Sequence, residues 1–289
     1  MESIPTAAAR GRVIRIGHSP DPDDAFMFYG LAAGKVPTGN FVVEQVLRDI
    51  ESLNRLALDG EIEVTAVSIH AYAYLADRYL LLPCGASMGD GYGPIVIARR
   101  PMTPRNLQRV TIAVPGRLTS AALALRLALG EVRTEVMPFD AILPAVASGE
   151  CEAGLIIHEG QLTYGQGGLH KIIDLGEWWK RETGLPLPLG GNAIRRDLGA
   201  GAIAEIGRFY RNSIRFALEN RAEALTYAMD YGRGLSRGLA DRFVGMYVND
   251  TTLDYGPAGR RAIELFLDRG HASGALPHRP AVEFAAVPS

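Results

Sequence analysis

The first two thirds of the chain alternate between short apolar runs and longer stretches in which apolar positions recur at helical spacing. The apolar runs predict strands at residues 13–17, 41–47, 63–67, 79–83, 94–98, 110–114, 135–137, 153–157 and 171–174. The stretches between them predict helices at 25–33, 50–58, 71–76, 121–129, 141–147 and 176–183. Alternating strands and helices are typical of an α/β fold.

The last third of the chain is predicted to be helical. From residue 202 onward apolar residues fall on one helix face, and we expect this stripe to pack into the core. It consists of Ile203, Ile206, Phe209, Tyr210, Ile214 and Ala217. Further helices are expected at about 222–231, 237–247 and 259–269, and the residues after Leu276 are expected to be irregular.

A short repeat suggests that the chain forms two lobes. Residues 60–63 (Gly-Glu-Ile-Glu) recur as 149–152 (Gly-Glu-Cys-Glu), each time between a helix and a strand. Ser68 and His158 stand at the ends of the strands that follow, and we expect both strand ends to face one ligand cleft. The Pro- and Gly-rich segment 184–191 is interpreted as a crossover back to the first lobe.

We therefore expect an α/β fold of two lobes with the ligand cleft between them. Residues 12–98 and 192–289 are assigned to a larger, discontinuous lobe. Residues 99–191 are assigned to a smaller lobe. Closure of such lobes would shed water from a bound small molecule.

Composition narrows the function classes. The chain has 289 residues, 47% of them hydrophobic, and a formal net charge of -2 at pH 7. This near-neutral balance gives no electrostatic case for binding nucleic acid. Residues 1–12 lack the apolar segment of a secretory signal, and no apolar run is long enough for a bilayer. Together with only two cysteines, at 84 and 151, this predicts a soluble cytoplasmic protein without a membrane partner. The oligomeric state is left open.

Two polar segments have competing interpretations. The cluster Asp21-Pro22-Asp23-Asp24 contains oxygen ligands that suit Mg²⁺ or Ca²⁺. Helix capping is favoured instead, with Asp21 as N-cap, Pro22 at the first helical position and two aspartates facing the helix dipole. The glycine-rich segment 85–93 is followed by a strand, which argues against a dinucleotide site. It is either a mobile ligand-facing loop or a tight connection.

Two further positions are candidates for chemistry. His158, delivered at the end of a buried strand, is the one strand-end group that titrates near neutrality, as a general base should. It is equally compatible with a hydrogen-bonded structural histidine. Thr119 and Ser120 open a helix, where free backbone N–H groups favour an anion. A plain N-cap explains these two hydroxyls equally well.

Several segments together resemble the 1,4-dihydroxy-6-naphthoate synthase family of the futalosine pathway to menaquinone. The likeness runs in register from about residue 13 to 266. The segments that carry it are 19–26, Leu53-Asn54-Arg55, Val114-Pro115-Gly116-Arg117, Ala153-Gly154-Leu155-Ile156-Ile157-His158-Glu159, 183–190 and Tyr247-Val248-Asn249.

This resemblance implies a type II periplasmic-binding-protein-like fold and cleavage of cyclic dehypoxanthine futalosine, a small carboxylate substrate, to 1,4-dihydroxy-6-naphthoate. It casts His158 as the proton acceptor. The family's cleft positions fall on Asn54, Ser68, Thr119 and Ser120. The last two stand at the helix start already considered for an anion, which suits an aryl carboxylate. The implied reaction needs neither a metal nor a redox cofactor.

Some residues depart from the family pattern. Asp21 and Asp23 stand where Cys and Asn are usual, and Ala25 stands where Thr is usual. Asn192 replaces an apolar residue, and His70 lies near the expected cleft at a position that is not usually histidine. These changes add negative charge and polarity near the expected site. The identity of the substrate is therefore left open.

Two alternative functions follow from these considerations. A non-catalytic binding protein for an organic anion is compatible with the architecture, because a fold alone does not imply catalysis. Another enzyme of the same fold, such as a chorismate dehydratase, is a further alternative. That family is not expected to carry the histidine found here at position 158.

Overall fold

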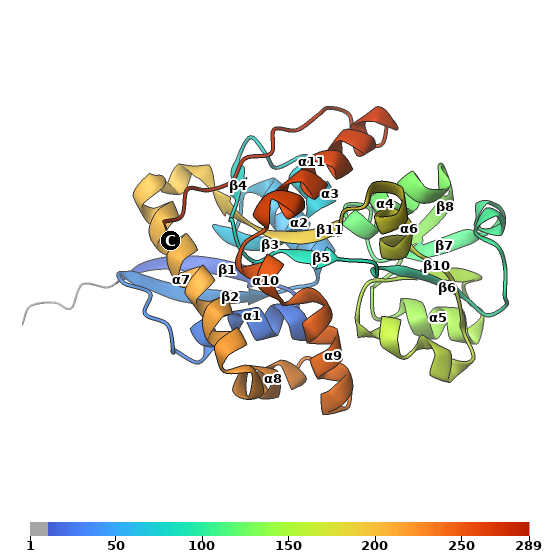
Figure 1. The fold of residues 1–289 in the computed structure, drawn as a ribbon, viewed down its shortest axis with the longest axis horizontal. Helices are drawn as coiled ribbons and strands as arrows, with labels where there is room; N and C mark the ends of the chain where they lie inside the picture. The colour runs from blue at the N-terminus through green and yellow to red at the C-terminus, as the bar shows by residue number, and fades with distance from the viewer. Residues whose placement is uncertain (1–10, 289) are drawn as a thin grey trace, which may run out of the picture.

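The computed structural model describes residues 11–288, and these form two lobes side by side, each built on one sheet (Figure 1). The sheet of the larger lobe has the order β2 (Phe41–Leu47), β1 (Arg12–His18), β3 (Val64–Ser68), β11 (Leu187–Arg195) and β4 (Tyr79–Leu81), with β5 (Ser87–Gly89) also paired to β11. The sheet of the smaller lobe has the order β10 (His170–Asp174), β6 (Ile95–Ala98), β9 (Ala153–Ile156), β7 (Thr111–Val114) and β8 (Arg133–Val136).

Helices cover both sheets. The α-helices are α1 (Pro22–Ala32), α2 (Ile50–Asp59), α3 (Ile69–Tyr72), α4 (Ser120–Leu129), α5 (Ile142–Ser148), α6 (Leu175–Thr183), α7 (Ala200–Glu219), α8 (Arg221–Met229), α9 (Arg237–Tyr247), α10 (Asp250–Leu253) and α11 (Gly256–Ala272). Short 3-10 helices are η1 (Pro104–Arg109), η2 (Glu159–Leu162), η3 (Tyr164–Gly167) and η4 (Arg196–Leu198). Helix α1 packs against α7, α8 and α9 on one face of the larger sheet (Figure 1). The expected apolar stripe of α7 is buried there, which confirms its role in the core.

The register of the strands brings the polar strand ends together. In the larger sheet, β1 runs parallel to β3, so the segment after His18 and the end of β3 at Ser68 lie at one edge. In the smaller sheet, β7 runs parallel to β9, so the segments after Val114 and after Ile156 share an edge. Because parallel strands place their carboxyl ends together, each lobe presents one loop-lined edge.

The repeated helix–turn–strand unit is present in both lobes. Helix α2 ends at Gly60 (φ 74°) before β3, and α5 ends at Gly149 (φ 89°) before β9. A left-handed φ at the residue after a helix favours glycine, which has no Cβ to clash. The two glycines therefore stop the helices and turn the chain into a central strand of each sheet.

Pairing in space changes two of the expected boundaries. Strand β6, expected to end the larger lobe, pairs with β9 and β10 in the smaller sheet. Residues 187–191, expected to be a crossover in the smaller lobe, begin strand β11, which pairs with β3 in the larger sheet. The glycine-rich segment 85–93 also holds a strand, β5, where we expected only a loop.

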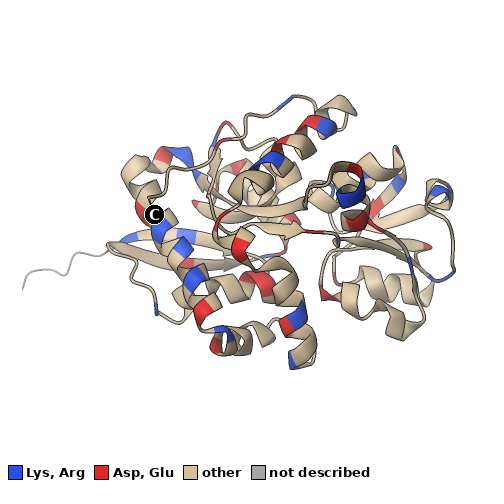
Figure 2. Cartoon of the chain, viewed as in Figure 1, with Lys and Arg blue, Asp and Glu red and all other residues tan. Residues whose placement is uncertain are grey.

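Charges of both signs are interspersed over the lobes (Figure 2). Within the described residues, every helix is too short or too polar to cross a membrane. Cys84 is buried, Cys151 is partly exposed, and both are free thiols. Residues 1–10, most of the segment in which we expected no secretory signal, lie outside the described part of the chain.

Candidate functional site

A cavity with an empty volume of about 690 Å³, partly open to solvent, lies where the two loop-lined edges meet. Its polar lining consists of Ser19, Asp21, Asp23, Asp24, Ser68, Ser87, Thr119, Ser120, Asn192 and Tyr247. The smaller lobe also contributes apolar lining, including Pro94 and Ile157. The cavity is therefore a cleft between the lobes, as expected.

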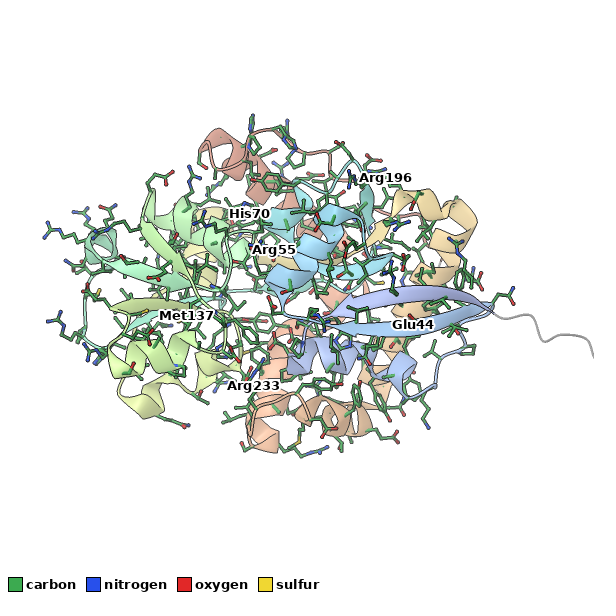
Figure 3. The ribbon with its side chains drawn as sticks, turned by 180° about the vertical axis from the view of Figure 1, so that it is seen from behind. Glu44, Arg55, His70, Met137, Arg196 and Arg233 are labelled. Carbon is green, nitrogen blue, oxygen red and sulfur yellow. The ribbon has the colours of Figure 1, made fainter. Side chains whose placement is uncertain are left out.

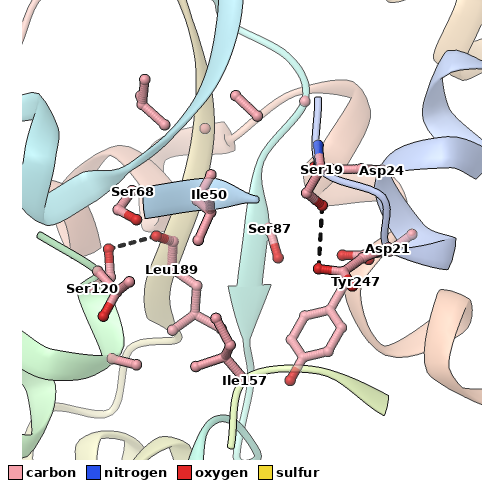
Figure 4. A pocket seen from close by; sticks show the side chains of 18 of the residues that line it. Ser19, Asp21, Asp24, Ile50, Ser68, Ser87, Ser120, Ile157, Leu189 and Tyr247 are labelled. Atoms are coloured by element: carbon pink, nitrogen blue, oxygen red, sulfur yellow. Dashed lines mark hydrogen bonds between the residues drawn. The ribbon is translucent and has the colours of Figure 1, made fainter. Parts of the chain in front are cut away.

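The cleft has two chemically different ends. In Figure 4, Ser68 and Ser120 lie on one side of the cavity, and Asp21 and Asp24 lie on the other. The hydroxyl end comprises Ser68, Thr119 and Ser120, and the acidic end comprises Asp21, Asp23 and Asp24. A ligand that spans the cleft thus meets different partners at its two ends.

At the hydroxyl end, Asn54 supports Ser68. The Asn54 side chain donates from Nδ2 to the Ser68 hydroxyl (3.1 Å) and accepts the Ser68 backbone N–H (2.9 Å). Asn54 is 0% exposed and is absent from the cavity lining, whereas Ser68 lines it. The Ser68 hydroxyl accepts from Asn54 and keeps its own hydrogen for a ligand. Asn54 acts on the cleft through Ser68.

The other two hydroxyls have partners within the protein. Thr119 is the N-cap of α4, accepting the Ala122 N–H at 3.2 Å and donating to the Gly116 carbonyl at 3.0 Å. The Ser120 hydroxyl accepts the His70 backbone N–H at 3.1 Å and donates to the Leu189 carbonyl. The N-cap interpretation of Thr119 is therefore confirmed. The Ala122 N–H is thus already used, and attraction for an anion rests on the backbone N–H groups of Ser120 and Ala121 at the start of α4.

His158 is buried beside this cleft, directly after Ile157, which lines the cavity. It is 6% exposed, and its ring lies edge-on to Phe139 with 5.7 Å between centroids. The Gly160 N–H donates to Nδ1 at 3.0 Å, while Nε2 has no hydrogen-bond partner among the described residues. Burial lowers the pKa of His158, so the imidazole is neutral at pH 7. The preceding residue, Ile157, lines the cavity, whereas His158 does not.

The Gly160 contact favours one tautomer of His158. A backbone N–H can only donate, so Nδ1 carries the lone pair and Nε2 carries the proton. The Glu159 carboxylate lies 3.7 Å from Nδ1, close enough to attract a proton there instead. The neighbours of the ring thus support either tautomer after a small movement.

The acidic end differs from the expected helix cap. Asp21 is the N-cap residue of α1 and Pro22 is the first helical residue, as expected. The Asp21 carboxylate, however, makes no capping hydrogen bond. It accepts from Ser19 Oγ at 3.2 Å and from Arg233 Nη2 at 2.7 Å. The capping interpretation is wrong for the Asp21 side chain, because a guanidinium outcompetes the helix N–H groups.

The two following aspartates are partly buried and line the cavity. Asp24 accepts the Ser19 N–H at 2.9 Å, and burial raises its pKa to about 6. Burial and the neighbouring Asp24 and Asp21 raise the pKa of Asp23 well above its ordinary range. Within residues 11–288, no three His, Cys, Asp or Glu side chains are arranged to hold a metal ion.

Of the other departures, Ala25 is fully buried, and the side chains of Asn192 and His70 lie against polar groups of the protein. Asn192 donates to the Gly85 carbonyl at 3.0 Å and accepts from the Tyr210 hydroxyl at 2.8 Å, although it also lines the cavity. The His70 ring faces the Thr119 carbonyl from Nδ1 at 3.2 Å, and burial lowers its pKa to about 4. His70 therefore supports the start of α4 from outside the cavity.

Tyr247 was missed as a site residue, although its segment contributed to the resemblance. It lines the cavity and donates from its hydroxyl to Gln161 Oε1 at 2.9 Å, which joins α9 to η2 across the lobes. The sequence around Tyr247 does not indicate a site residue, because an aromatic residue in the last turn of a helix usually packs into the core.

Comparison with known proteins supports both the fold and a family. Residues 14–272 match the sequence family described as menaquinone biosynthesis. A Thermus thermophilus protein named 1,4-dihydroxy-6-naphthoate synthase is 45% identical over 262 residues, covering 90% of this chain and 95% of the relative. A Streptomyces coelicolor protein of the same name is 39% identical over 272 residues, covering 91% and 95%.

Solved structures show the same architecture. A crystal structure of an Archaeoglobus fulgidus protein superposes with a TM-score of 0.88 at 50% identity, covering 91% of this chain and 98% of that one. An alkanesulfonate-binding protein from Xanthomonas axonopodis superposes with a TM-score of 0.71 at 13% identity, covering 95% and 98%. The latter likeness concerns the fold alone. The fold is thus the two-lobed, type II periplasmic-binding-protein-like fold.

Proposed function

The chain belongs to the menaquinone biosynthesis family and is an enzyme of that pathway, and from this we propose that it converts cyclic dehypoxanthine futalosine to 1,4-dihydroxy-6-naphthoate. The observation that carries the proposal is a cleft between two lobes with a buried, neutral histidine at its edge. The two relatives that bear the synthase name cover nearly the whole chain. A cytoplasmic location fits the two free thiols.

The two ends of the cleft suggest how this substrate lies. Its aryl carboxylate suits the hydroxyl end, where the N-terminus of α4 favours negative charge and Ser68 has a hydroxyl hydrogen to donate. The hydroxyl-bearing carbons derived from ribose suit the acidic end, where Asp23 and Asp24 offer acceptor oxygens. In this orientation Thr119 and Ser120 shape the anion site mainly through their backbone.

His158 serves as the general base in this proposal. Because burial keeps the imidazole neutral, a ring nitrogen has a lone pair available at pH 7. Proton abstraction at Nε2 requires the proton to reside on Nδ1, where Glu159 at 3.7 Å replaces Gly160 as the partner. Substrate binding would drive this exchange, since Nε2 otherwise has no hydrogen-bond partner among the described residues.

The chemistry then follows from the substrate. His158 takes an acidic proton from carbon next to a carbonyl, and the electrons of that C–H bond move toward the carbonyl. Their return forms a C=C bond and expels the former ribose carbons with the electron pair of the broken bond. The imidazolium of His158 returns its proton to that leaving fragment, and formation of the aromatic ring drives the elimination forward. The step as proposed uses only proton transfer and bond cleavage, so we include no metal or redox cofactor.

The decisive experiment is an incubation of the purified protein with cyclic dehypoxanthine futalosine, without added metal. Chromatography is expected to show 1,4-dihydroxy-6-naphthoate accumulating with time. Recovery of intact substrate from a complex that forms but does not react would instead favour a non-catalytic binding protein. Absence of both binding and product would contradict the proposed substrate.

A further inference from the structure

Arg233, in the segment between α8 and α9, has an unusual backbone conformation. Its φ is 48°, and within residues 11–288 it is the one residue other than glycine with a positive φ. A side chain is strained in this region because Cβ crowds the backbone. Such strain persists only where the surrounding contacts over-determine it, and it occurs often at functional sites. The contacts of the Arg233 side chain are therefore informative.

The guanidinium of Arg233 binds two carboxylates at once. Nη1 donates to both oxygens of Glu159, at 2.7 and 2.8 Å. Nη2 donates to Asp21 Oδ1 at 2.7 Å and to the Pro20 carbonyl at 3.3 Å. The planar guanidinium presents several donors in a fixed fork, which a lysine ammonium does not.

These partners belong to different lobes. Asp21 precedes α1 in the larger lobe, whereas Glu159 follows β9 in the smaller lobe. The guanidinium also lies 4.8 Å from the centroid of the Phe139 ring, again in the smaller lobe. Figure 3 shows Arg233 where the two lobes meet. The Glu159 side chain is only 6% exposed, so water does little to stabilise its negative charge. The Arg233 guanidinium provides that stabilisation instead.

The same partners surround His158. Phe139 packs edge-on against the imidazole, and Glu159 lies 3.7 Å from Nδ1. The charged groups that face the ring are Glu159, Asp21 and Arg233, and the Phe139 carbonyl lies beside them. Arg233 thus touches both the aromatic wall and the carboxylate that hold the histidine.

We propose that Arg233 is a positioning residue, which joins Asp21 to Glu159 across the cleft and so holds Phe139, Glu159 and His158 in their working arrangement. The inference rests on the proposed function, in which the Glu159 carboxylate accepts a hydrogen bond from the protonated Nδ1 of His158. Arg233 itself contacts no reacting atom. Its loss frees Glu159, lets the lobes separate beside His158 and exposes the imidazole to water.

The test compares Arg233→Met, which keeps the length of the side chain but not its charge, with Arg233→Lys. Arg237→Met is the matched control, since Arg237 is exposed and binds Thr226 and the Ala222 carbonyl within the larger lobe. The first measurement is the titration of the His158 imidazole by NMR, assigned with His158→Gln. Arg233→Met is expected to raise the pKa of His158, because a nearby positive charge and part of the burial are lost. Arg237→Met is expected to leave it unchanged.

The second measurement is turnover of cyclic dehypoxanthine futalosine. We expect kcat to fall about tenfold or more in Arg233→Met, with a smaller fall in Arg233→Lys, because a misplaced base loses its alignment. A His158 titration like that of the wild type in Arg233→Met would overturn the inference, whatever happens to kcat. Where Arg233→Met does not fold, Arg233→Lys carries the test through kcat, because it keeps the charge and loses the planar fork that joins Asp21 to Glu159. A wild-type kcat in Arg233→Lys would then overturn the inference. A wild-type protein that binds but does not convert the substrate would contradict the proposed function alone, since the titration still tests Arg233.

Discussion

The backbone N–H of Gly160 donates to Nδ1 of His158 at 3.0 Å, and this contact favours the tautomer that carries the proton on Nε2. It leaves Nε2 protonated and without a partner among the described residues. If Nε2 is to accept a proton, the proton must first reside on Nδ1. The hydrogen-bond partner of Nδ1 must therefore change from the Gly160 N–H to the Glu159 carboxylate before or during the reaction. The geometry of residues 158–160 thus controls the proposed chemistry more directly than the histidine alone.

Gly160→Ala is expected to displace the imidazole. A Cβ at residue 160 would lie 2.7 Å from His158 Cε1 and 3.0 Å from Leu143 Cδ1, so the ring must move. A shift of about 1 Å in a catalytic group costs about 100-fold in rate, and we expect a loss of kcat of this order. The control is Gly165→Ala, where an added Cβ meets nothing within 4 Å. Equal kcat in the two variants would contradict the importance of the ring position.

His158→Ala is expected to fold normally and to lose turnover. Removal of a general base typically costs between about 100-fold and about 10,000-fold in kcat. Steady-state kinetics and thermal unfolding measure the two effects separately. His170→Ala, at an exposed position at the start of β10, serves as the control. Near-normal turnover in His158→Ala would rule out this histidine as the base.

The pH profile of kcat/KM is expected to fall on the acid side below pH 6.5. The pKa of His158 is lowered by burial, so the neutral, basic form persists down to a lower pH than for an exposed histidine. Activity is then full above the lowered pKa and is lost as pH falls through it. Asp24, with a pKa of about 6, is the competing titrating group. The limb should therefore remain in Asp24→Asn; its disappearance there would assign it to Asp24.

The double change Thr119→Val with Ser120→Ala is expected to affect both stability and binding. Loss of the Thr119 N-cap costs about 1 kcal/mol of unfolding free energy. Loss of the Ser120 contacts to His70 and Leu189 loosens the start of α4, which we expect to raise KM more than it lowers kcat. Ser68→Ala is the comparison, because it removes a hydroxyl without disturbing a helix cap. Unchanged stability and KM in the double variant would contradict the role of this helix start.

Much of the local structure could be predicted because it depends on short-range patterns. The expected bounds of the strand 41–47 and the helix 237–247 are confirmed, because short apolar runs and helical spacing of apolar residues are local patterns of the sequence. The glycines that end helices at 60 and 149 could also be predicted, because each belongs to a short motif that is visible within its own segment. The resemblance to a family, which rests on many such segments together, is confirmed over residues 14–272.

Only the tertiary structure decided how these elements and side chains pair. The apolar run 95–98 fits either sheet, and only its partners place it in the smaller lobe. Arg233 lies 74 positions from Glu159 and 212 from Asp21, so nothing in its own segment indicates these partners. Sequence therefore determined most of the elements, the family and the candidate histidine, whereas β5 and β11 emerged only from their pairing in the larger sheet. The fold determined which nitrogen of His158 is engaged and which hydroxyls are free, because hydrogen bonds depend on distances that only packing sets.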